Sequence, residues 1–516
     1  MRKGKIVLLP LDERPCNYNY PLMMPKSDYE VIVPPKEIIG DKKIPGDTTK
    51  IAKWLIENAS CADAMVISLD TLVYGGLVPS RLHHNGEDEL VESVDLLGEL
   101  KRINPALKLY VFGLIMRCPF YSSDDEEPDY YKDFGTEIHL YGKYTHLEKL
   151  GKLTDEDKKD FERVKDKVGK AELSDYIERR KINISVLMHA LSYVADNTVD
   201  YFIVPQDDSA PYGFTAMDQI KVREYLKSNV LHMKTAMYPS ADDIGMTLLA
   251  RAVSELTGIS PKVYVYYPSV KGALTIPQYE DRIIGETIKY HILSVGGIQV
   301  YSLCEADILL AVNVGSGMET DALLDVIGSS CKEKTQACES VRFYDVERNL
   351  AEFINYIKYA LSINKYVAIA DVARVNKGDE ELISILNRED MLLKIHGYAG
   401  WNTSSNTIGT ALSSVVTYMA GNDDAGLKSF LLHRYYEDIG YMCYARMHTT
   451  KNHLSDMGLT YHCVDGKNGK TARLIEKELA EYMNKNYPAL SACVDKLEVA
   501  LPWERMFEID LRLTIL

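Results

Sequence analysis

The chain has 516 residues, of which 46% are hydrophobic and 26% are charged, and its formal net charge is −16. A chain of this length exceeds the size at which a single hydrophobic core usually stops growing, so two or more domains are expected. The composition is typical of a soluble globular protein and not of a disordered chain. The negative charge argues against nucleic acid as a partner, because affinity for nucleic acid depends on Lys and Arg side chains that neutralise phosphates.

The beginning of the chain carries no sign of export. The apolar run at residues 6–11 is too short for the core of a signal peptide, and the sequence has no stretch of about 18 uncharged apolar residues that would predict a membrane helix. The nine cysteines are dispersed without a Cys-x-x-Cys pair, which argues against a secreted disulfide framework and against a structural zinc knuckle. The sequence therefore predicts a cytoplasmic protein with no membrane partner.

Short apolar runs recur along the chain and alternate with longer helical patterns. The runs predicted as strands are residues 5–11, 29–33, 64–69, 108–116, 201–205, 234–238, 262–267, 299–302, 307–312, 366–370 and 392–396. The amphipathic helices predicted between them are residues 47–58, 90–103, 171–195, 216–227, 241–257 and 278–294. Uninterrupted apolar runs are typical of strands buried on both faces, and their alternation with helices predicts crossover units and parallel strand pairing.

This alternation predicts an α/β protein with Rossmann-like, mostly parallel sheets in two closely associated domains. We place the first domain at residues 1–238, the second at 239–421 and a helical C-terminal cap at 422–516. A (β/α)8 barrel with insertions is the alternative. A charged insertion at residues 119–170 interrupts the first domain. Long insertions are either lids over a site or solvated surface, and the sequence leaves both open.

The residues directly after the predicted strands are rich in carboxylates. In open parallel sheets, ligands bind beyond the carboxyl ends of the strands, so these positions are the first candidates for a site. Asp12 and Glu13 follow the first strand, Asp70 follows the third, and Asp207 and Asp208 follow the fifth. A residue at such a position is often only the N-cap of the next helix, but capping does not require Gln, paired Asp and Arg at so many strand ends. We therefore expect at least one functional carboxylate in this set.

Two carboxyl groups beside a bond can divide the acid and base roles when their surroundings separate their pKa values. We predict Asp207 or Asp208 as the general acid or base, with Asp12 or Asp70 as its partner. The side chains predicted to bind the substrate are Glu13, Arg14, Asn17, Tyr74, Arg81, Arg117, Gln206, Tyr398, Trp401, Asn402 and Asn406. The arginines would hold an anionic group or orient a carboxylate, the aromatic rings would stack on a sugar, and the asparagines would bind its hydroxyl groups.

Three functions are compatible with this pattern. The first is an intracellular hydrolase, a glycoside hydrolase acting on a small saccharide or a cell-wall fragment without a cofactor. The second is a metal-dependent hydrolase or lyase in which Asp12, Asp207 and Asp208 bind a divalent metal, since hard cations need only oxygen ligands. The third is a non-catalytic protein that binds a sugar or another metabolite. The expected partner is in each case a small molecule, and the sequence does not predict the oligomeric state.

Several motifs taken together resemble one bacterial family. They are LDERPCN (11–17), LDTLVYGGL (69–77) with SR (80–81), PQDDSAPYG (205–213), YEDR (279–282) with GET (285–287), and YAGWNT (398–403). The chain is similar, over nearly its whole length, to the family catalogued as domain of unknown function 4127 (DUF4127). It departs from the family pattern at SADD (240–243), where Gly-Ala-Asp-Glu is expected, and in the segment after Asp371. The family name implies no activity, so the residues themselves have to indicate the chemistry.

Overall fold

The computed structural model describes residues 4–207, 209–315, 345 and 347–516. The chain divides into two compact units, the first with Met1–Gly258 and Tyr279–Asp281, the second with Ile259–Gln278 and Arg282–Leu516. The first unit extends past the limit predicted at residue 238, because helix α11 (Ile244–Thr257) packs against three strands of its sheet. Residues 422–516 share the hydrophobic core of the second unit, so the predicted cap is part of that unit.

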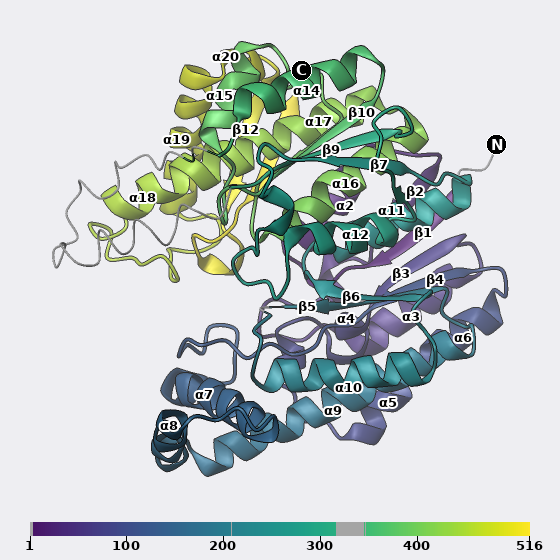
Figure 1. The fold of residues 1–516 in the computed structure, drawn as a ribbon, viewed down its shortest axis with the longest axis vertical. Coiled ribbons are helices and arrows are strands. Elements are labelled where there is room, and N and C mark those ends of the chain that lie inside the picture. The colour runs from purple at the N-terminus through teal and green to yellow at the C-terminus, as the bar shows by residue number, and fades with distance from the viewer. Residues whose placement is uncertain (1–3, 208, 316–344, 346) are drawn as a thin grey trace. The chain divides into compact units, whose positions relative to one another are not determined.

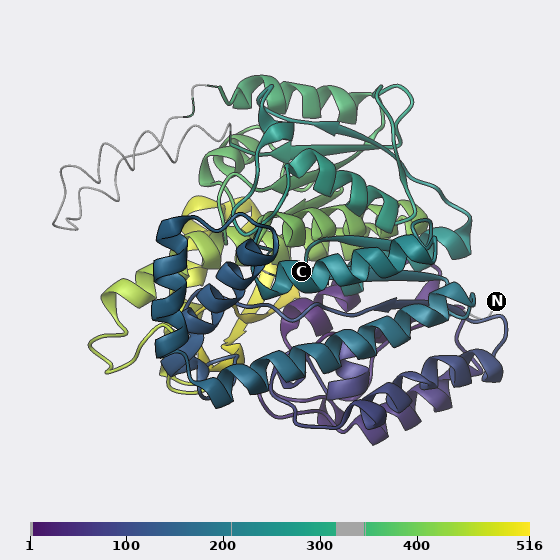
Figure 2. The same cartoon turned by 60° about the horizontal axis from the view of Figure 1, so that its bottom comes forward.

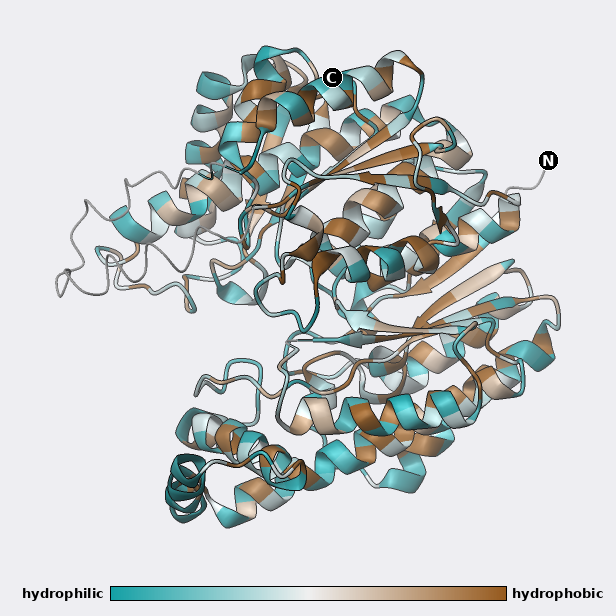
Figure 3. Ribbon diagram, in the orientation of Figure 1, coloured by the Kyte–Doolittle hydropathy of each residue, from teal (hydrophilic) through white to brown (hydrophobic). Residues whose placement is uncertain are grey.

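The first unit is built on a six-stranded parallel sheet in the order β2-β1-β3-β4-β5-β6. The strands are β1 (Gly4–Leu9), β2 (Tyr29–Ile32), β3 (Ala64–Ser68), β4 (Lys108–Phe112), β5 (Tyr201–Gln206) and β6 (Thr235–Pro239). Every residue of β3, β5 and β6 is buried, which explains why these strands are uninterrupted apolar runs in the sequence. In Figure 3 the strands behind the front edge of this sheet are mostly brown, and the helices beside the sheet alternate between brown and teal.

The second unit contains a five-stranded parallel sheet in the order β11-β10-β9-β7-β8. The strands are β7 (Lys262–Tyr266), β8 (Ile298–Gln299), β9 (Ile308–Asn313), β10 (Tyr366–Asp371) and β11 (Gly397–Ala399). Counted from the first strand of each unit, both sheets follow the flavodoxin-like order 2-1-3-4-5, and the first sheet adds a sixth strand at its edge. The α/β class is confirmed, and because both sheets are open across the described residues, the barrel alternative is wrong.

Two predicted strands differ from the structure. The prediction at residues 299–302 shares only Gln299 with β8, and the prediction at residues 392–396 is wrong throughout. Residues 392–396 form a turn that precedes β11, in which Leu392 and Ile395 are buried although they are not in a strand. These two residues are three positions apart, a spacing that a tight turn can bring to one side as readily as a helix does. The prediction that these apolar residues are buried is therefore confirmed, whereas the prediction that they form an extended strand is wrong.

Helices cover both faces of the first sheet. They are α1 (Pro15–Tyr18), α2 (Tyr20–Met23), α3 (Thr48–Ala59), α4 (Leu69–Tyr74), α5 (Glu87–Val94), α6 (Leu96–Ile103), α7 (Tyr131–Lys149), α8 (Asp155–Lys167), α9 (Lys170–Ala195), α10 (Phe214–Ser228) and α11. Successive strand residues point to opposite faces, so Val7 and Leu9 share a core with α3, α6 and α9, whereas Leu8 faces α11 at Gly245. This alternation places α11 on the face opposite to the other long helices.

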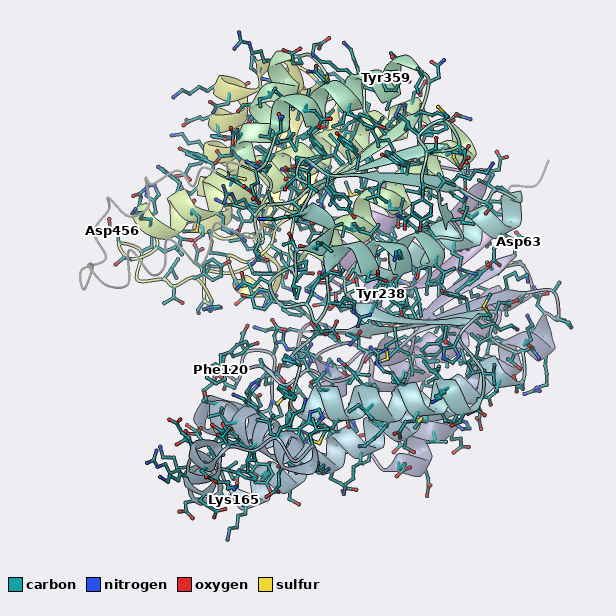
Figure 4. All side chains as sticks on the ribbon, in the orientation of Figure 1. Asp63, Phe120, Lys165, Tyr238, Tyr359 and Asp456 are labelled. Carbon is teal, nitrogen blue, oxygen red and sulfur yellow. The ribbon has the colours of Figure 1, made fainter. Side chains whose placement is uncertain are left out.

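The charged insertion has two parts. Helices α7 and α8 lie side by side at one end of the first unit (Figures 1 and 2), and the mostly polar α8 carries exposed charges such as Lys165, labelled in Figure 4. The polar face of α8 is solvated surface, whereas α7 buries Tyr131 and Ile138 in a hydrophobic cluster. The part before α7 is different, because Glu127 is completely buried there. In Figure 4, Phe120 of this segment lies at the opposite end of the first unit from Asp63, which precedes β3, and so at the carboxyl ends of the strands.

The second unit has helices between the strands of its sheet and a mainly helical region after its last strand. Its helices are α12 (Ile284–Ser294), α14 (Leu350–Ser362), α15 (Glu380–Arg388), α16 (Ser404–Gly421), α17 (Asp424–Arg434), the π-helical segment η5 (Tyr435–Ala445), α18 (Arg446–Asn452), α19 (Lys470–Asn486) and α20 (Pro488–Ser491). Residues 422–516 end in an antiparallel pair, β12 (Val494–Ala500) and β13 (Asp510–Ile515), which the prediction of a helical cap did not include. Every helix in the described part of the chain is too short or too polar to cross a lipid bilayer.

Candidate functional site

The first unit gathers buried charged side chains beyond the carboxyl ends of its strands. The strand order reverses between β1 and β3, and doubly wound sheets bind ligands at this position. Asp12 and Arg14 follow β1, and Asp70 lies in the first turn of α4 directly after β3. The hydroxyl of Thr71 connects the two segments, since it lies 2.7 Å from two backbone carbonyl oxygens that follow β1. The local backbone thus brings these side chains to one edge of the sheet.

Arg14 joins two buried carboxylates. Its Nε and Nη2 donate to Oδ2 of Asp12 at 2.9 and 2.7 Å, and Nη2 also donates to Oδ1 of Asp242 at 2.6 Å. The amide of Asn17 donates to the same two carboxylates at 2.9 and 3.0 Å. Burial raises the pKa of Asp242 and the charge of Asp12 raises it further, whereas Arg14 lowers it. Arg14 and Asn17, both predicted to bind substrate, therefore hold carboxylates in place.

Arg81 forms a second node with residues from three segments. It is 1% exposed, its Nη2 donates to Oδ2 of Asp207 at 2.9 Å, and its Nη1 lies 3.3 Å from both Glu126 and Glu127. Arg117 binds the same two glutamates, with Nε donating to Glu127 at 2.8 Å and Nη2 to Glu126 at 3.0 Å. The two glutamates were not among the predicted site residues, although the acidic run at residues 124–127, seven residues after Arg117, was a usable signal.

Asp207 is the most accessible carboxylate of these two nodes. Its side chain is 18% exposed, against 4% for Asp12, 8% for Asp242, 15% for Glu126 and 0% for Glu127. It directly follows β5, as the sequence predicts. Its neighbour Asp208, the other candidate for an acid or base, lies outside the described residues.

The surroundings of Asp70 raise the pKa of its carboxyl group. Burial raises the pKa of Asp70 to about 6, although the backbone N–H of Leu114, which donates to it at 3.0 Å, the hydroxyl of Ser80 and the charge of Arg81 all lower it. Burial likewise raises the pKa of Asp243 to about 7, although this side chain accepts hydrogen bonds from Ser240 and Thr247. Asp243 thereby ties the loop after β6 to α11, a structural role. Asp70 instead sits where the strand order reverses.

The cluster carries more negative than positive charge. Its groups are the guanidinium groups of Arg14, Arg81 and Arg117 and the carboxyl groups of Asp12, Asp70, Glu126, Glu127, Asp207 and Asp242. The three arginines are engaged with carboxylates, so the prediction that they orient carboxylates fits this geometry better than the prediction that they hold an anion. A divalent metal on Asp12 and Asp207 would have to compete with these guanidinium groups for the same oxygen atoms.

A cavity of about 520 Å³ is lined by several residues that are sequence neighbours of the cluster residues. Its walls include Leu82 and His84, just after Arg81, and residues 128–130, just after Glu127. Arg179 and Asp175 also line this cavity, and the buried guanidinium group of Arg179 donates to the two carboxylate oxygens of Asp175 at 3.0 and 2.8 Å. The volume falls within the range of about 300–1,000 Å³ that is usual for small-molecule sites.

Other predicted residues of the first unit have structural contacts. Glu13 accepts a hydrogen bond from the backbone N–H of Lys42 at 2.9 Å, and the amide of Gln206 donates to Asp281 at 3.0 Å. The ring of Tyr74 is 7% exposed and stacks on His83 with 4.8 Å between the ring centroids. The prediction that this ring stacks on a sugar therefore does not fit the structure.

The remaining predicted residues belong to the second unit, and all of them except the half-buried Asn402 lie in its interior. Tyr398 is fully buried and donates its hydroxyl to Asp371 at 2.9 Å. Trp401 is 3% exposed and its indole N–H donates to Thr410 at 3.2 Å, so it offers no face for a sugar. Asn402 takes a left-handed turn conformation with φ 54°, and Asn406 is buried in the first turn of α16. The burial of Tyr398, Trp401 and Asn406 argues against their assignment to substrate binding, whereas the assignment of the half-buried Asn402 stays a prediction.

The second sheet also gathers polar groups at its strand ends. Asn313, the last residue of β9, donates to Asp371 at 2.8 Å and to Asp379 at 3.1 Å, and the backbone N–H of Asp379 donates to Asp371 at 2.7 Å. Burial, and then the charge of Asp379, raises the pKa of Asp371 to about 7. Arg348 pairs with Asp379 at 2.5 Å. All of these groups satisfy one another, which indicates a network that holds the strand ends together.

Comparison with known proteins identifies one match. A family model described as "Protein of unknown function (DUF4127)" matches residues 6–512, which include both sheets and the whole cluster around Asp70 and Asp207. No curated protein and no solved structure gives a significant match. The resemblance seen in the sequence motifs is therefore confirmed, and the chemistry has to be inferred from the site itself.

Proposed function

Because the chain belongs to the DUF4127 family, whose description assigns no activity, we propose a function from the site of the first unit. The protein is an acid–base hydrolase of small, uncharged polar substrates, and glycosides are the substrate class to test first. One observation carries the proposal: Asp70, with a pKa of about 6, lies within the electrostatic influence of Arg81, which binds the more exposed Asp207.

The two carboxyl groups have the environments that an acid and a base require. Burial keeps the proton on Asp70 up to a pH of about 6, about two units higher than for an ordinary aspartate, as a general acid needs. Arg81 stabilises the negative charge of Asp207 at 2.9 Å, and this side chain is accessible to a substrate or to water. Pairs of carboxyl groups whose surroundings separate their protonation states are the usual sign of divided acid and base roles.

The charge of the cluster favours an uncharged substrate. Six carboxyl groups face three guanidinium groups, so a phosphate or a carboxylate would be repelled unless it displaced a carboxylate from an arginine. Glycosides are uncharged, and their hydrolysis uses two carboxyl groups and no cofactor. In the proposed reaction Asp70 donates its proton to the leaving-group oxygen, and Asp207 activates a water molecule or attacks the anomeric carbon.

The test is a release assay on a panel of aryl glycosides, both unmodified and N-acetylated. Asp70→Asn and Asp207→Asn should each lower kcat by about 100-fold or more, the usual contribution of a general acid or base. Asp200→Asn is the matched control, because Asp200 forms ion pairs with two lysines at the amino end of the same strand β5. Asp200→Asn should keep its activity.

The pH profile gives a second, independent measurement. Activity should fall as the pH rises through about 6, because Asp70 then loses the proton that it donates. This limb should disappear in the residual activity of Asp70→Asn. A silent panel overturns the assignment to glycosides, and full activity in Asp207→Asn overturns the assignment of the catalytic pair.

A further inference from the structure

The second unit contains a cluster of side chains that are typical ligands of transition metals. His448 lies on α18, His453 is the C-cap of that helix, and Glu478 lies on α19. One ligand atom from each residue can be chosen so that the three atoms lie within 4.8 Å of one another. We infer that His448, His453 and Glu478 bind a divalent transition-metal ion of the zinc class, independently of the carboxylates of the first unit.

The distances fit a shared ion. Nδ1 of His448 lies 3.0 Å and Nε2 of His453 lies 3.1 Å from the same oxygen, Oε1 of Glu478. A tetrahedral zinc ion with bonds of about 2.0–2.1 Å keeps its ligand atoms about 3.4 Å apart. Each imidazole nitrogen therefore needs to move away from the glutamate oxygen by only a few tenths of an ångström to admit the ion.

The hydrogen bonding of His448 points to a missing partner. Its Nδ1 is buried, and no described residue makes a hydrogen bond to it, although Oε1 of Glu478 is only 3.0 Å away. The direction between the two groups is therefore wrong for a hydrogen bond despite the short distance. A buried polar atom without a partner is uncommon and indicates a ligand that would satisfy it. A cation between the two atoms would take up the lone pairs of both.

Neighbouring residues hold the three side chains in place. The hydroxyl of Thr449 donates to Oε2 of Glu478 at 2.8 Å, which fixes the carboxylate and leaves Oε1 for the ion. Tyr444 stacks on His448 at 5.1 Å between centroids, and Tyr482 stacks on Tyr444 at 4.4 Å. Such supporting contacts orient the ligands of metal sites. The ligands are therefore positioned before any ion arrives.

The backbone explains how two histidines five positions apart can converge. Residues separated in this way point in different directions on a continuous α-helix. Helix α18 ends at Asn452, and His453 leaves the helical conformation with φ −130° and ψ −36°. This change of direction at the helix end accounts for the approach of His453 to the same carboxylate oxygen.

The ligand set selects the class of metal and leaves a position free. Two imidazoles and one carboxylate suit zinc and its neighbours, whereas magnesium and calcium prefer oxygen ligands alone. The side chains of His448 and His453 are 37% and 38% exposed, so water can reach the ion. Three protein ligands with an open fourth position are the arrangement of sites in which the metal binds a water molecule.

The experiment is a titration of the chelator-treated full-length protein with Zn²⁺ by calorimetry, repeated with Co²⁺ to record the absorption spectrum of its coordination. One ion should bind per chain, and the melting temperature should rise with Zn²⁺. His453→Ala and Glu478→Gln should each weaken binding at least tenfold. His462→Ala is the matched control, because His462 is an exposed histidine that is not part of the cluster, and it should bind like the wild type.

His453 is the first residue to replace because its side chain is partly exposed, and circular dichroism will verify that the variant is folded. An absence of stoichiometric Zn²⁺ binding to the wild type overturns the inference. It is equally overturned if His453→Ala and His462→Ala weaken binding alike, because that result indicates an ion held only by exposed histidines. A tetrahedral Co²⁺ spectrum that is lost in Glu478→Gln supports the site.

Discussion

Asparagine in place of Asp70 changes one proton-binding group and little else. In the folded protein, burial raises the pKa of Asp70 to about 6 from an ordinary value of 3.8. Between these values the folded state keeps a proton that the unfolded chain has lost, so the stability of the wild type should fall as the pH rises from about 4 to about 6. At about 1.4 kcal/mol per pKa unit, the cost above pH 6 is about 3 kcal/mol.

Asp70→Asn removes this cost because the amide is never ionised. Its side-chain oxygen can still accept the hydrogen bond from the N–H of Leu114, which the aspartate accepts at 3.0 Å. The variant should therefore be more stable than the wild type at pH 7.5, by up to about 3 kcal/mol, and the gain should shrink towards zero near pH 4. A buried catalytic acid is expected to reduce the stability of the protein in this way.

The measurement is guanidinium-induced unfolding at several pH values, followed by fluorescence. Trp54 is the one of the chain's three tryptophans that belongs to the first unit, so curves recorded with and without Trp54→Phe isolate the transition of that unit. Asp200→Asn should show the opposite sign. Burial raises the pKa of Asp200, but Lys108, the N–H of Leu109 and Lys101 together lower it, so its stabilising effect should be lost at low pH. A less stable Asp70→Asn at pH 7.5 would mean that the folded protein does not raise the pKa of Asp70, and the assignment of Asp70 as the acid would then be wrong.

Four further substitutions test the charged cluster of the first unit, a turn beside it and the polar network of the second sheet. Glu127→Gln should lower the free energy of unfolding by about 3 kcal/mol because it removes a buried charge that neutralises two arginines, and Glu126→Gln, whose side chain is 15% exposed, should cost less in the same denaturation experiment. Gly75→Ala should lower the melting temperature by several degrees, since its φ is +82° and a Cβ atom would lie 2.5 Å from the nitrogen of Gly46; an unchanged melting temperature would contradict this geometry. Asp371→Asn should stabilise the second unit above pH 7, where the buried aspartate is forced to ionise, and a loss of stability in urea at pH 8 would refute the raised pKa.

The strands of the two sheets could be predicted because burial on both faces leaves a direct trace in the sequence. Strands such as β5, buried at all six residues, are continuous apolar runs with polar residues at their ends. Their order in the sheet leaves no such trace, since it depends on where each crossover helix packs. The boundary of the first unit was placed too early for this reason: α11 follows the last strand of the sheet but returns across β1, β3 and β4.

The site was predictable only as far as strand ends define it. Asp12, Asp70 and Asp207 lie where a parallel sheet places its functional residues, whereas Asp242 and Glu127 reach the cluster through contacts between segments distant in the sequence. Asp242 was not among the predicted site residues, and nothing in its local sequence indicates the bond to Arg14. The predicted roles of the aromatic residues do not fit the structure for another reason. Composition does not distinguish a ring that faces a ligand from a ring that fills a core, and Trp401 fills a core.

The short segment Tyr279–Asp281 determines when the first unit is completed during synthesis of the chain. It belongs to the first unit but is encoded among residues of the second. It accepts two hydrogen bonds from the end of β5, one from the amide of Gln206 to Asp281 at 3.0 Å and one from the N–H of Ser209 to the carbonyl of Tyr279 at 3.2 Å. The ribosome delivers the sheet first and these partners later, so the strand end that carries Asp207 acquires its final contacts only after residue 281 has emerged. A chain ending at residue 258 would keep the six strands but lack both bonds, and separate expression of the two units would have to preserve this segment.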